Sequence, residues 1–292
     1  MMSSTKFVSL FLLILTVASE RLFAENHGAD PVQEKDDTMQ QLVRRKNEHP
    51  LMPIIRWAEK ERPRIADIKD YTALLTKRES IEGVLQEPQV MEIKVRHEPF
   101  SVYVKSRFPA RLNGQEAIFI QGRNDGKVIA HGAGVERTLG TQRITPEGVI
   151  AMRGNKYPIT DLGLLNLIDK LLEVGRRDTK FGECDVKYYE NVKVGERKCI
   201  LLEITHPVPR KNFVFHIARI FVDAELKLPI RYDSHDWPPE GEEKPILIEE
   251  YTYENLKLNT GLTDRDFDYR NPDYGYTIND RHGEISTETQ KK

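Results

Sequence analysis

The stretch NFVFHIARIFVDAELKLPIRYDSHDW, residues 212–237, predicts two long β-strands joined by a tight, polar turn. Its first arm is apolar on both faces, which are formed by Phe213, Phe215, Ile217 and Phe221 on one side and by Val214, Ala218, Ile220 and Val222 on the other. A strand of this kind is covered on both sides. Pro229 cannot donate to a strand ladder, so the second arm begins there or lies at a sheet edge. The hairpin therefore predicts a sheet with packing on both faces.

Residues before this hairpin alternate between polar and apolar, which predicts a meander of about five antiparallel strands. In one of them Met91, Ile93 and Val95 alternate with charged residues, so one face is buried and one is wet. Asn113 with Gly114 is a turn signal between two of the strands. The predicted strands cover residues 71–79, 89–97, 100–107, 116–121 and 127–131.

Helical spacing predicts a first helix over residues 51–67 that is broken at Pro63, because proline lacks the N–H of the helix ladder. A second, leucine-rich helix is predicted over residues 160–174, with Thr160 as N-cap and Gly175 as C-cap. Little of its circumference is polar, so it is expected to be buried on most sides. It is either an ordinary core helix or a helix that covers a hydrophobic cavity.

Further strands are predicted over residues 184–190, 198–205 and 245–256, and a short helical turn over residues 262–268. Residues 132–158 lack a clear pattern and are long for a structureless loop, and loops of that length are usually functional or mobile. Antiparallel meanders with helices inserted on one side imply an α+β domain with a strongly curved antiparallel sheet.

The two ends of the chain differ from this domain. Residues 1–24 have a lysine, then the apolar run FVSLFLLILTV and Leu22-Phe23-Ala24, as in a secretory signal peptide. Export is therefore expected, with no permanent membrane span after cleavage. Residues 25–49 are predicted to be a disordered leader and residues 269–292 a frayed polar tail, which leaves residues 50–268 as one domain. A formal net charge of -2 gives no reason to expect nucleic acid as a partner.

Motifs that carry chemistry are weak. The sequence has no HExxH, paired CxxC or GxSxG motif, so no catalytic residue, metal or cofactor is assigned. His216 with Asp233 and His235 could meet across the hairpin as an acid–base or metal site, and the alternative is a set of hydrogen-bonded histidines at the rim. His206, Arg210 and Lys211 either contact an anionic headgroup or belong to a solvated loop.

The two cysteines, Cys184 and Cys199, allow one disulfide, and the strand register decides it. A turn at residues 195–196 places Cys199 opposite Val192, with Cys184 about 26 Å away along the strand, whereas a bridge needs Cα atoms within about 7 Å. A turn at residues 191–192 places the two cysteines directly opposite each other. Both registers remain open from the sequence.

The segments KDYTALLTKRESIEG, IFVDAELKLPIRYD and LTDRDFD resemble the LolA/LolB-like superfamily of bacterial lipoprotein carriers. Within it the chain resembles an uncharacterised exported bacterial domain of unknown function, through NGQEAIFIQGRNDGK, AMRGNKYPITDLGLLNL and HPVPRKNFVFHIARIFVD. This closer likeness covers residues 50–268. It implies an incomplete β-barrel with helices packed into its concave face, around a cavity that takes acyl chains in the better-known relatives.

Three functions are compatible with these observations. The first is a non-catalytic envelope protein that binds a lipid, acyl chain or lipoprotein in the hollow of the sheet. The second is an interaction or sensory module with a filled cavity, which binds an envelope protein partner, and the third is an enzyme that uses His216, Asp233 and His235. For the first, the expected cavity lining is Leu164, Leu165, Ile168, Leu171, Leu172, Phe213, Phe215 and Ile217. In this lining, Phe213, Phe215 and Ile217 have an alternative in the other apolar face of the hairpin, which consists of Val214, Ala218, Ile220 and Val222.

Overall fold

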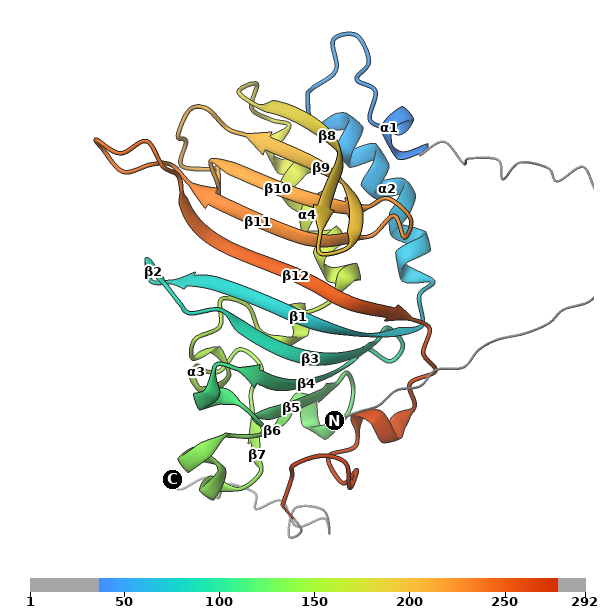
Figure 1. Ribbon diagram of the computed structural model, residues 1–292, viewed down its shortest axis with the longest axis vertical. Coiled ribbons are helices and arrows are strands. Elements are labelled where there is room, and N and C mark those ends of the chain that lie inside the picture. The colour runs from blue at the N-terminus through green and yellow to red at the C-terminus, as the bar shows by residue number, and fades with distance from the viewer. Residues whose placement is uncertain (1–36, 278–292) are drawn as a thin grey trace, which may run out of the picture. The chain divides into compact units, whose positions relative to one another are not determined.

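A computed structural model of the chain describes residues 37–277, and the predicted signal peptide lies outside them. The alternating segments form one antiparallel sheet of 12 strands in the order β7-β6-β5-β4-β3-β1-β12-β11-β10-β9-β8, with β2 paired to β1 (Figure 1). The first and last long strands thus pair in the middle and join two meanders. The strands are β1 Asp70–Ile81, β2 Val84–Leu85, β3 Gln89–Arg96, β4 Ser101–Phe108, β5 Glu116–Ile120, β6 Val128–His131, β7 Gln142–Ile144, β8 Asp185–Val194, β9 Arg197–Thr205, β10 Ile217–Asp223, β11 Pro229–Asp236 and β12 Ile246–Leu258.

Two long helices, α2 and α4, lie together on one side of the curved sheet (Figure 1). The predicted fold class is confirmed: the sheet is open and antiparallel, it is not closed into a barrel, and helices pack against it. The α-helices are α1 Asp37–Gln41, α2 Met52–Ala66, α3 Val149–Met152 and α4 Leu164–Asp178, and the 3-10 helices are η1 Ala110–Leu112, η2 Asn124–Gly126, η3 Gly134–Leu139, η4 Ile159–Asp161 and η5 Asp264–Phe267.

Both predicted ends of the leucine-rich helix are wrong. Helix α4 begins after Gly163, whose φ of 130° is open to glycine, and the N–H of Leu164 donates to the Tyr71 hydroxyl at 2.9 Å. At its other end the helix continues through Gly175 to Asp178, so Gly175 is not a cap. Gly175 faces α2, and an added Cβ would lie 3.4 Å from Cγ1 of Ile55, which is ordinary van der Waals contact.

The predicted break in the first helix is also wrong, because α2 continues through Pro63 to Ala66. The carbonyl of Pro63 still accepts the N–H of Asp67 at 2.9 Å, and Ile65 beyond it is fully buried. Packing of this last turn into the core outweighs the one helix hydrogen bond that proline cannot make.

The hairpin that organises the chain has a shorter first arm than predicted. Strand β10 begins only at Ile217, and Phe213 lies before it, stacked on His206 with ring centroids 3.8 Å apart. Ala218 and Ile220 point to the helix side, whereas Ile217 lies on the other face. The alternate apolar face of the hairpin therefore faces α4.

The register of β8 and β9 excludes the disulfide between Cys184 and Cys199. Cys199 pairs with Val192, as expected for a turn at residues 195–196, and both cysteines are free and buried. Burial raises the pKa of the Cys184 thiol to about 12 and that of the Cys199 thiol to about 11, so both stay protonated and unreactive near neutral pH.

The predicted leader and tail are ordered where the structure describes them. Leu42, within the supposed leader, is 3% exposed in the main core. In the supposed tail Tyr274 stacks on Tyr103 at 4.2 Å between ring centroids, and the Tyr276 hydroxyl donates to the carbonyl of Ile129 at 3.1 Å. The prediction of disorder is therefore wrong for residues 37–49 and 269–276, because their apolar side chains pack on the domain.

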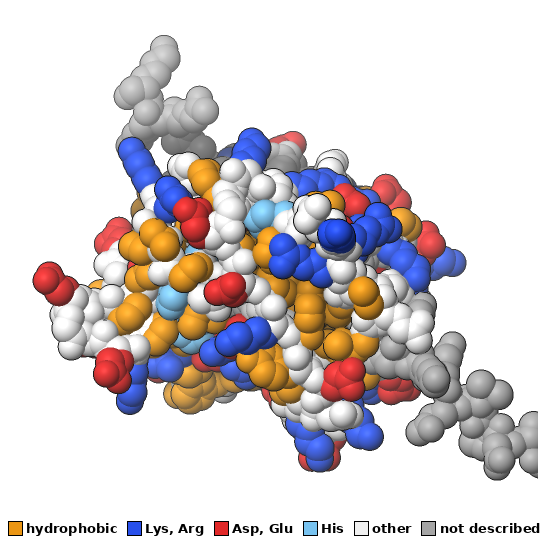
Figure 2. Space-filling model, turned by 90° about the horizontal axis from the view of Figure 1, so that it is seen from above, with side chains coloured by type: hydrophobic (Ala, Val, Ile, Leu, Met, Phe, Trp, Pro, Cys, Tyr) orange, Lys and Arg blue, Asp and Glu red, His pale blue; other side chains and the backbone are white. Residues whose placement is uncertain are grey.

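The outer surface carries both signs of charge. Figure 2 shows Lys and Arg side chains beside Asp and Glu side chains on the face seen from above, with hydrophobic patches between them. On the face of β9–β12 that is turned away from the cavity, Arg219 donates to Glu203 at 2.8 Å and Arg231 pairs with Glu250 at 3.1 Å. These ion pairs are only partly buried, and pairs near the surface contribute little to stability.

Candidate functional site: a cavity with a polar end

A cavity of about 1390 Å³ lies between the concave face of the sheet, helices α2 and α4, and residues 150–163. Strands of both meanders contribute to it, as Ala117 and Val128 do from one and Ala218 and Ile220 from the other. Most of its wall is apolar. Because the cavity crosses the middle of the sheet, it belongs to the whole domain.

The predicted lining residues separate into two groups. Leu171, Leu172 and Phe215 line the cavity. Outside the wall lie Leu164, Leu165, Ile168, Phe213 and Ile217. Leu164 and Ile168 are fully buried on the helix face that packs against protein, so they form the core beneath the cavity. The lining residues that sequence reasoning missed on α4 include Leu167, Lys170 and Val174.

The predicted headgroup contact is wrong for His206, which is 0% exposed and bonds to Asp178 at 3.2 Å and to the carbonyl of Glu183. Arg210 pairs with Glu183, and Lys211 is exposed. None of the three lines the cavity. His206 instead fastens the end of β9 to the end of α4.

The suggested acid–base neighbourhood does not form a site. Asp233 and His235 contact each other at 3.4 Å, but they lie on the sheet face opposite the cavity, where Arg219 and Arg231 flank Asp233. The His216 ring bonds to the carbonyl of His206 instead. The three side chains do not converge on one cleft, so the geometry gives no support to an enzyme built on them.

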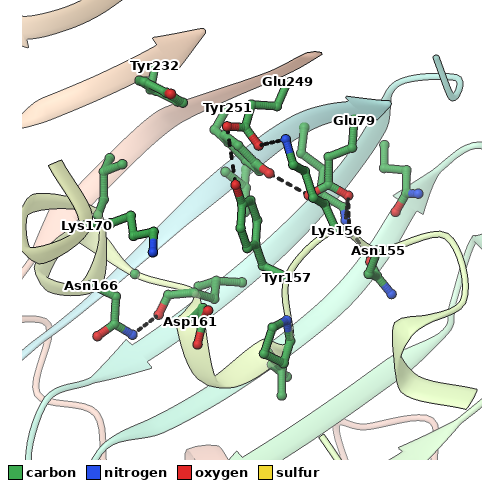
Figure 3. Close-up of a pocket in the computed structure, with 18 of the residues that line it drawn as sticks. Glu79, Asn155, Lys156, Tyr157, Asp161, Asn166, Lys170, Tyr232, Glu249 and Tyr251 are labelled. Atoms are coloured by element: carbon green, nitrogen blue, oxygen red, sulfur yellow. Dashed lines mark hydrogen bonds and ion pairs between the residues drawn. The ribbon is translucent and has the colours of Figure 1, made fainter. Parts of the chain in front are cut away.

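A polar cluster occupies one end of the cavity, and the sequence reasoning missed it (Figure 3). It is built from two neighbouring rungs of the sheet. In one rung Glu79 of β1, Glu249 of β12 and Ser234 of β11 lie side by side, and in the next Lys77, Tyr251 and Tyr232 do so. Residues 155–157 complete the cluster from the loop before α4. It is defined here as the polar end: Lys77, Glu79, Asn155, Lys156, Tyr157, Tyr232, Ser234, Glu249 and Tyr251.

Glu79 is a saturated member of the polar end. It accepts hydrogen bonds from the Tyr251 hydroxyl at 2.6 Å, from Lys77 at 2.8 Å and from the backbone N–H of Lys156 at 3.1 Å. Lys77 also donates to Asn155 at 2.7 Å. Glu79 and Lys77 thereby fix the loop of residues 155–157 to the sheet, which is a structural role.

Glu249 is less well satisfied. Its Oε1 receives only long contacts, 3.4 Å from the Tyr157 hydroxyl and 3.3 Å from Ser234. Its Oε2 is buried without a hydrogen-bond partner among the described residues, although Nζ of Lys156 lies 2.9 Å away as an ion pair. Burial raises the pKa values of the Tyr157, Tyr232 and Tyr251 hydroxyls, and the charge of Glu249 raises them further. These phenols are therefore neutral at physiological pH.

Another buried carboxylate, Glu116, lies at a different edge of the cavity from Glu79 and Glu249. It pairs with Lys105 at 2.9 Å and accepts the backbone N–H of Gly275 at 3.0 Å. Burial alone would raise the pKa of Glu116, but the nearby His131 ring, the Lys105 ammonium and the backbone N–H of Gly275 outweigh it and lower that pKa. These contacts hold the C-terminal segment against β5, so Glu116 is accounted for by structure.

Two exposed aliphatic side chains mark the rim of the cavity. Leu139 of η3 is 69% exposed and Ile150 of α3 is 66% exposed, and both line the opening. The patternless segment of the sequence therefore forms this rim. Among residues 37–277 no group of acidic, histidine and cysteine side chains is placed to hold a metal ion, and none of the helices there is long and apolar enough to cross a membrane.

A family model described as a protein of unknown function, DUF1571, matches residues 68–276. The chain belongs to the DUF1571 family. The match spans the complete sheet, α4 and the polar end, and it confirms the likeness to a domain of unknown function. No curated protein matches this DUF1571 chain.

Several solved structures are similar to this DUF1571 protein. A DUF1329 family protein from Desulfovibrio piger has 14% identity and a TM-score of 0.37, over 76% of this chain and 98% of that chain. Lipoprotein LppX from Mycobacterium tuberculosis has 10% identity and a TM-score of 0.41, over 74% and 99%. A LolA superfamily protein from Nitrosomonas europaea has 11% identity and a TM-score of 0.29, over 72% and 97%.

Proposed function

We propose that this DUF1571 protein is an exported, non-catalytic protein that binds a lipid or acyl chain in its cavity. The cavity itself carries the proposal: about 1390 Å³ is left unfilled between α4 and the sheet, with a mostly apolar wall. Small-molecule pockets usually measure about 300–1,000 Å³, so this one suits a large amphiphile. Export rests on the signal-like residues 1–24.

The open interior favours lipid binding over the interaction module with a filled cavity. The rim also favours lipid binding. Leu139 and Ile150 expose apolar side chains to water, and a bound acyl chain would cover part of that surface.

The test begins with organic extraction of the purified protein and mass spectrometry of the extract, in which co-purifying lipid is expected. After lipid removal, the uncharged fluorescent probe N-phenyl-1-naphthylamine should bind and be displaced by dodecanol. Leu171→Asp places a charge in the cavity wall and should weaken dodecanol binding about tenfold, since about 1.4 kcal/mol corresponds to that factor.

Leu165→Asp is the matched control, because Leu165 has similar partial burial on the same helix but does not line the cavity. Its dodecanol affinity should equal that of the wild type. An extract without lipid, together with no probe binding by the wild type, would refute the proposed function.

A further inference from the structure

The polar end is unusual because it gathers four charged side chains in one part of a mostly apolar wall. The side chains of Glu79 and Glu249 are 3% and 8% exposed, and those of Lys77 and Lys156 are 10% and 27% exposed. Buried ion pairs of this kind are often no more stable than apolar residues of similar size. Stability alone therefore does not explain why these groups face the cavity.

The two carboxylates have different hydrogen-bonding states. Glu79 receives three hydrogen bonds of 2.6, 2.8 and 3.1 Å, whereas Oε1 of Glu249 receives only long ones and its Oε2 is held by the ion pair with Lys156. A buried carboxylate is stable only when it is paired and hydrogen-bonded. Glu249 therefore depends on Lys156, and a cationic group inside the cavity could take the place of that residue.

The surroundings of Glu249 are suited to a cation. The Tyr157 hydroxyl lies beside its carboxylate, and the face of the Tyr157 ring is already in contact with a cation, which aromatic faces attract. Lys156 shows that an ammonium group fits there, because its Nζ lies 2.9 Å from Glu249 and 5.6 Å from the centroid of the Tyr157 ring. Figure 3 shows Lys156 and Tyr157 pointing at Glu249 from the loop before α4.

We propose that Glu249, with the ring of Tyr157, binds the ammonium headgroup of an amphiphile whose acyl chain fills the cavity. This inference rests on the proposed function and specifies its ligand class. Lys156 is then the resident cation that the headgroup of the ligand displaces from Glu249. Since Lys156 lies on a loop and is the most exposed of the four ionisable groups, it can move into solvent.

Three probes with the same chain and different headgroups test the inference: dodecylamine, dodecanol and dodecanoate, each measured by displacement of N-phenyl-1-naphthylamine. Glu249→Gln keeps the shape of the side chain and removes its charge. It should weaken dodecylamine binding about tenfold and leave dodecanol binding unchanged. Lys156→Gln should strengthen dodecylamine binding about tenfold, because the competing cation is gone.

Glu250→Gln is the matched control, since Glu250 is the next residue but lies on the opposite face with Arg231. It should leave all three affinities unchanged. Circular dichroism checks the fold of each variant, and the loop variant Lys156→Gln keeps the test valid if Glu249→Gln is unstable.

The opposite changes in affinity would identify an anionic ligand. If Lys156→Gln weakens dodecanoate binding and Glu249→Gln strengthens it, the polar end binds an anion and the inference is wrong. If the wild type binds dodecanol but Glu249→Gln leaves the affinity for dodecylamine unchanged, this inference is wrong while the proposed function is unaffected. Failure of every probe on the wild type would instead refute the proposed function.

Discussion

At the scale of single residues, Asp223 explains why the hairpin turn has its shape. Its side chain is 1% exposed and accepts the backbone N–H groups of Glu225 at 2.9 Å and Leu226 at 2.8 Å. Arg197 pairs with it from β9. Burial alone would raise the pKa of Asp223, but the hydrogen bonds from Arg197 and from the turn outweigh it and lower the pKa.

Asp223→Asn should therefore lower the free energy of unfolding by about 2–3 kcal/mol at neutral pH, because charge-assisted hydrogen bonds are lost. The stabilisation by Asp223 is present above the unfolded-state pKa of about 3.9 and disappears as the pH falls through the lower folded-state pKa. Urea unfolding of both proteins from pH 7 down to pH ~3 measures this.

The control is Glu225→Gln, which removes an exposed partner of Arg197 and should change stability by less than about 0.5 kcal/mol. The wild type and Asp223→Asn should therefore become more similar in free energy of unfolding as the pH falls. A difference that stayed constant down to the lowest pH would contradict the assigned role of the carboxylate.

The sequence offered one signal for the polar end, which is the position of its charged residues within the alternating pattern of their strands. Lys77 and Glu79 have the same strand parity as the buried Leu75, and Glu249 has that of the buried Tyr253. Charged residues on the apolar parity of a strand are a sign of function. Their meeting could not be predicted, because β1 and β12 are far apart in the sequence and only the fold pairs them.

At the scale of elements, the contact between α2 and α4 controls one wall of the cavity. Gly175 faces α2, and an added Cβ would lie 3.4 Å from Ile55, which is ordinary van der Waals contact. Gly175→Leu should force the helices apart and lower the free energy of unfolding by about 1–3 kcal/mol. Gly175→Ala should be neutral or stabilising by up to about 1 kcal/mol, because the Cβ fits and alanine has the better helix propensity.

Gly182→Leu is the matched control, because open space surrounds Gly182 and its backbone is unstrained. It should change stability by less than about 0.5 kcal/mol in thermal or urea unfolding. Equal effects of leucine at both positions would show that the helix contact is not the reason for Gly175.

Elements with local patterns were the ones that the sequence predicted well. Alternation located β1 and β3, and Asp223 to Pro229 located the central turn. The starts of β10 and α4 were missed, because tertiary contacts decide them: Phe213 stacks on His206, and the N–H of Leu164 donates to Tyr71. Periodicity within one segment contains no information about such contacts.

At the scale of the whole molecule, a ligand in the cavity would contact both meanders at once. Binding to the native state alone adds about 2.7 kcal/mol of stability at a ligand concentration about 100 times Kd. Dodecanol should therefore raise the unfolding temperature in a concentration-dependent way, and hydrogen exchange should slow in both β4–β6 and β9–β11. Protection confined to one meander would show that the ligand does not lie across the cavity.

The pairing of β1 with β12 in the middle of the sheet also has a consequence for the order in which the protein is made. Tyr71 pairs with Leu258, and Glu79 pairs with Glu249. One side of the polar end therefore comes from a strand that is synthesised early, and the other from a strand that is synthesised late. A nascent chain that does not yet include β12 can form its first meander but lacks the strand that pairs the two halves of the sheet. The cavity and its polar end can therefore form only after β12 has been synthesised, and a ligand can enter only once both meanders are present.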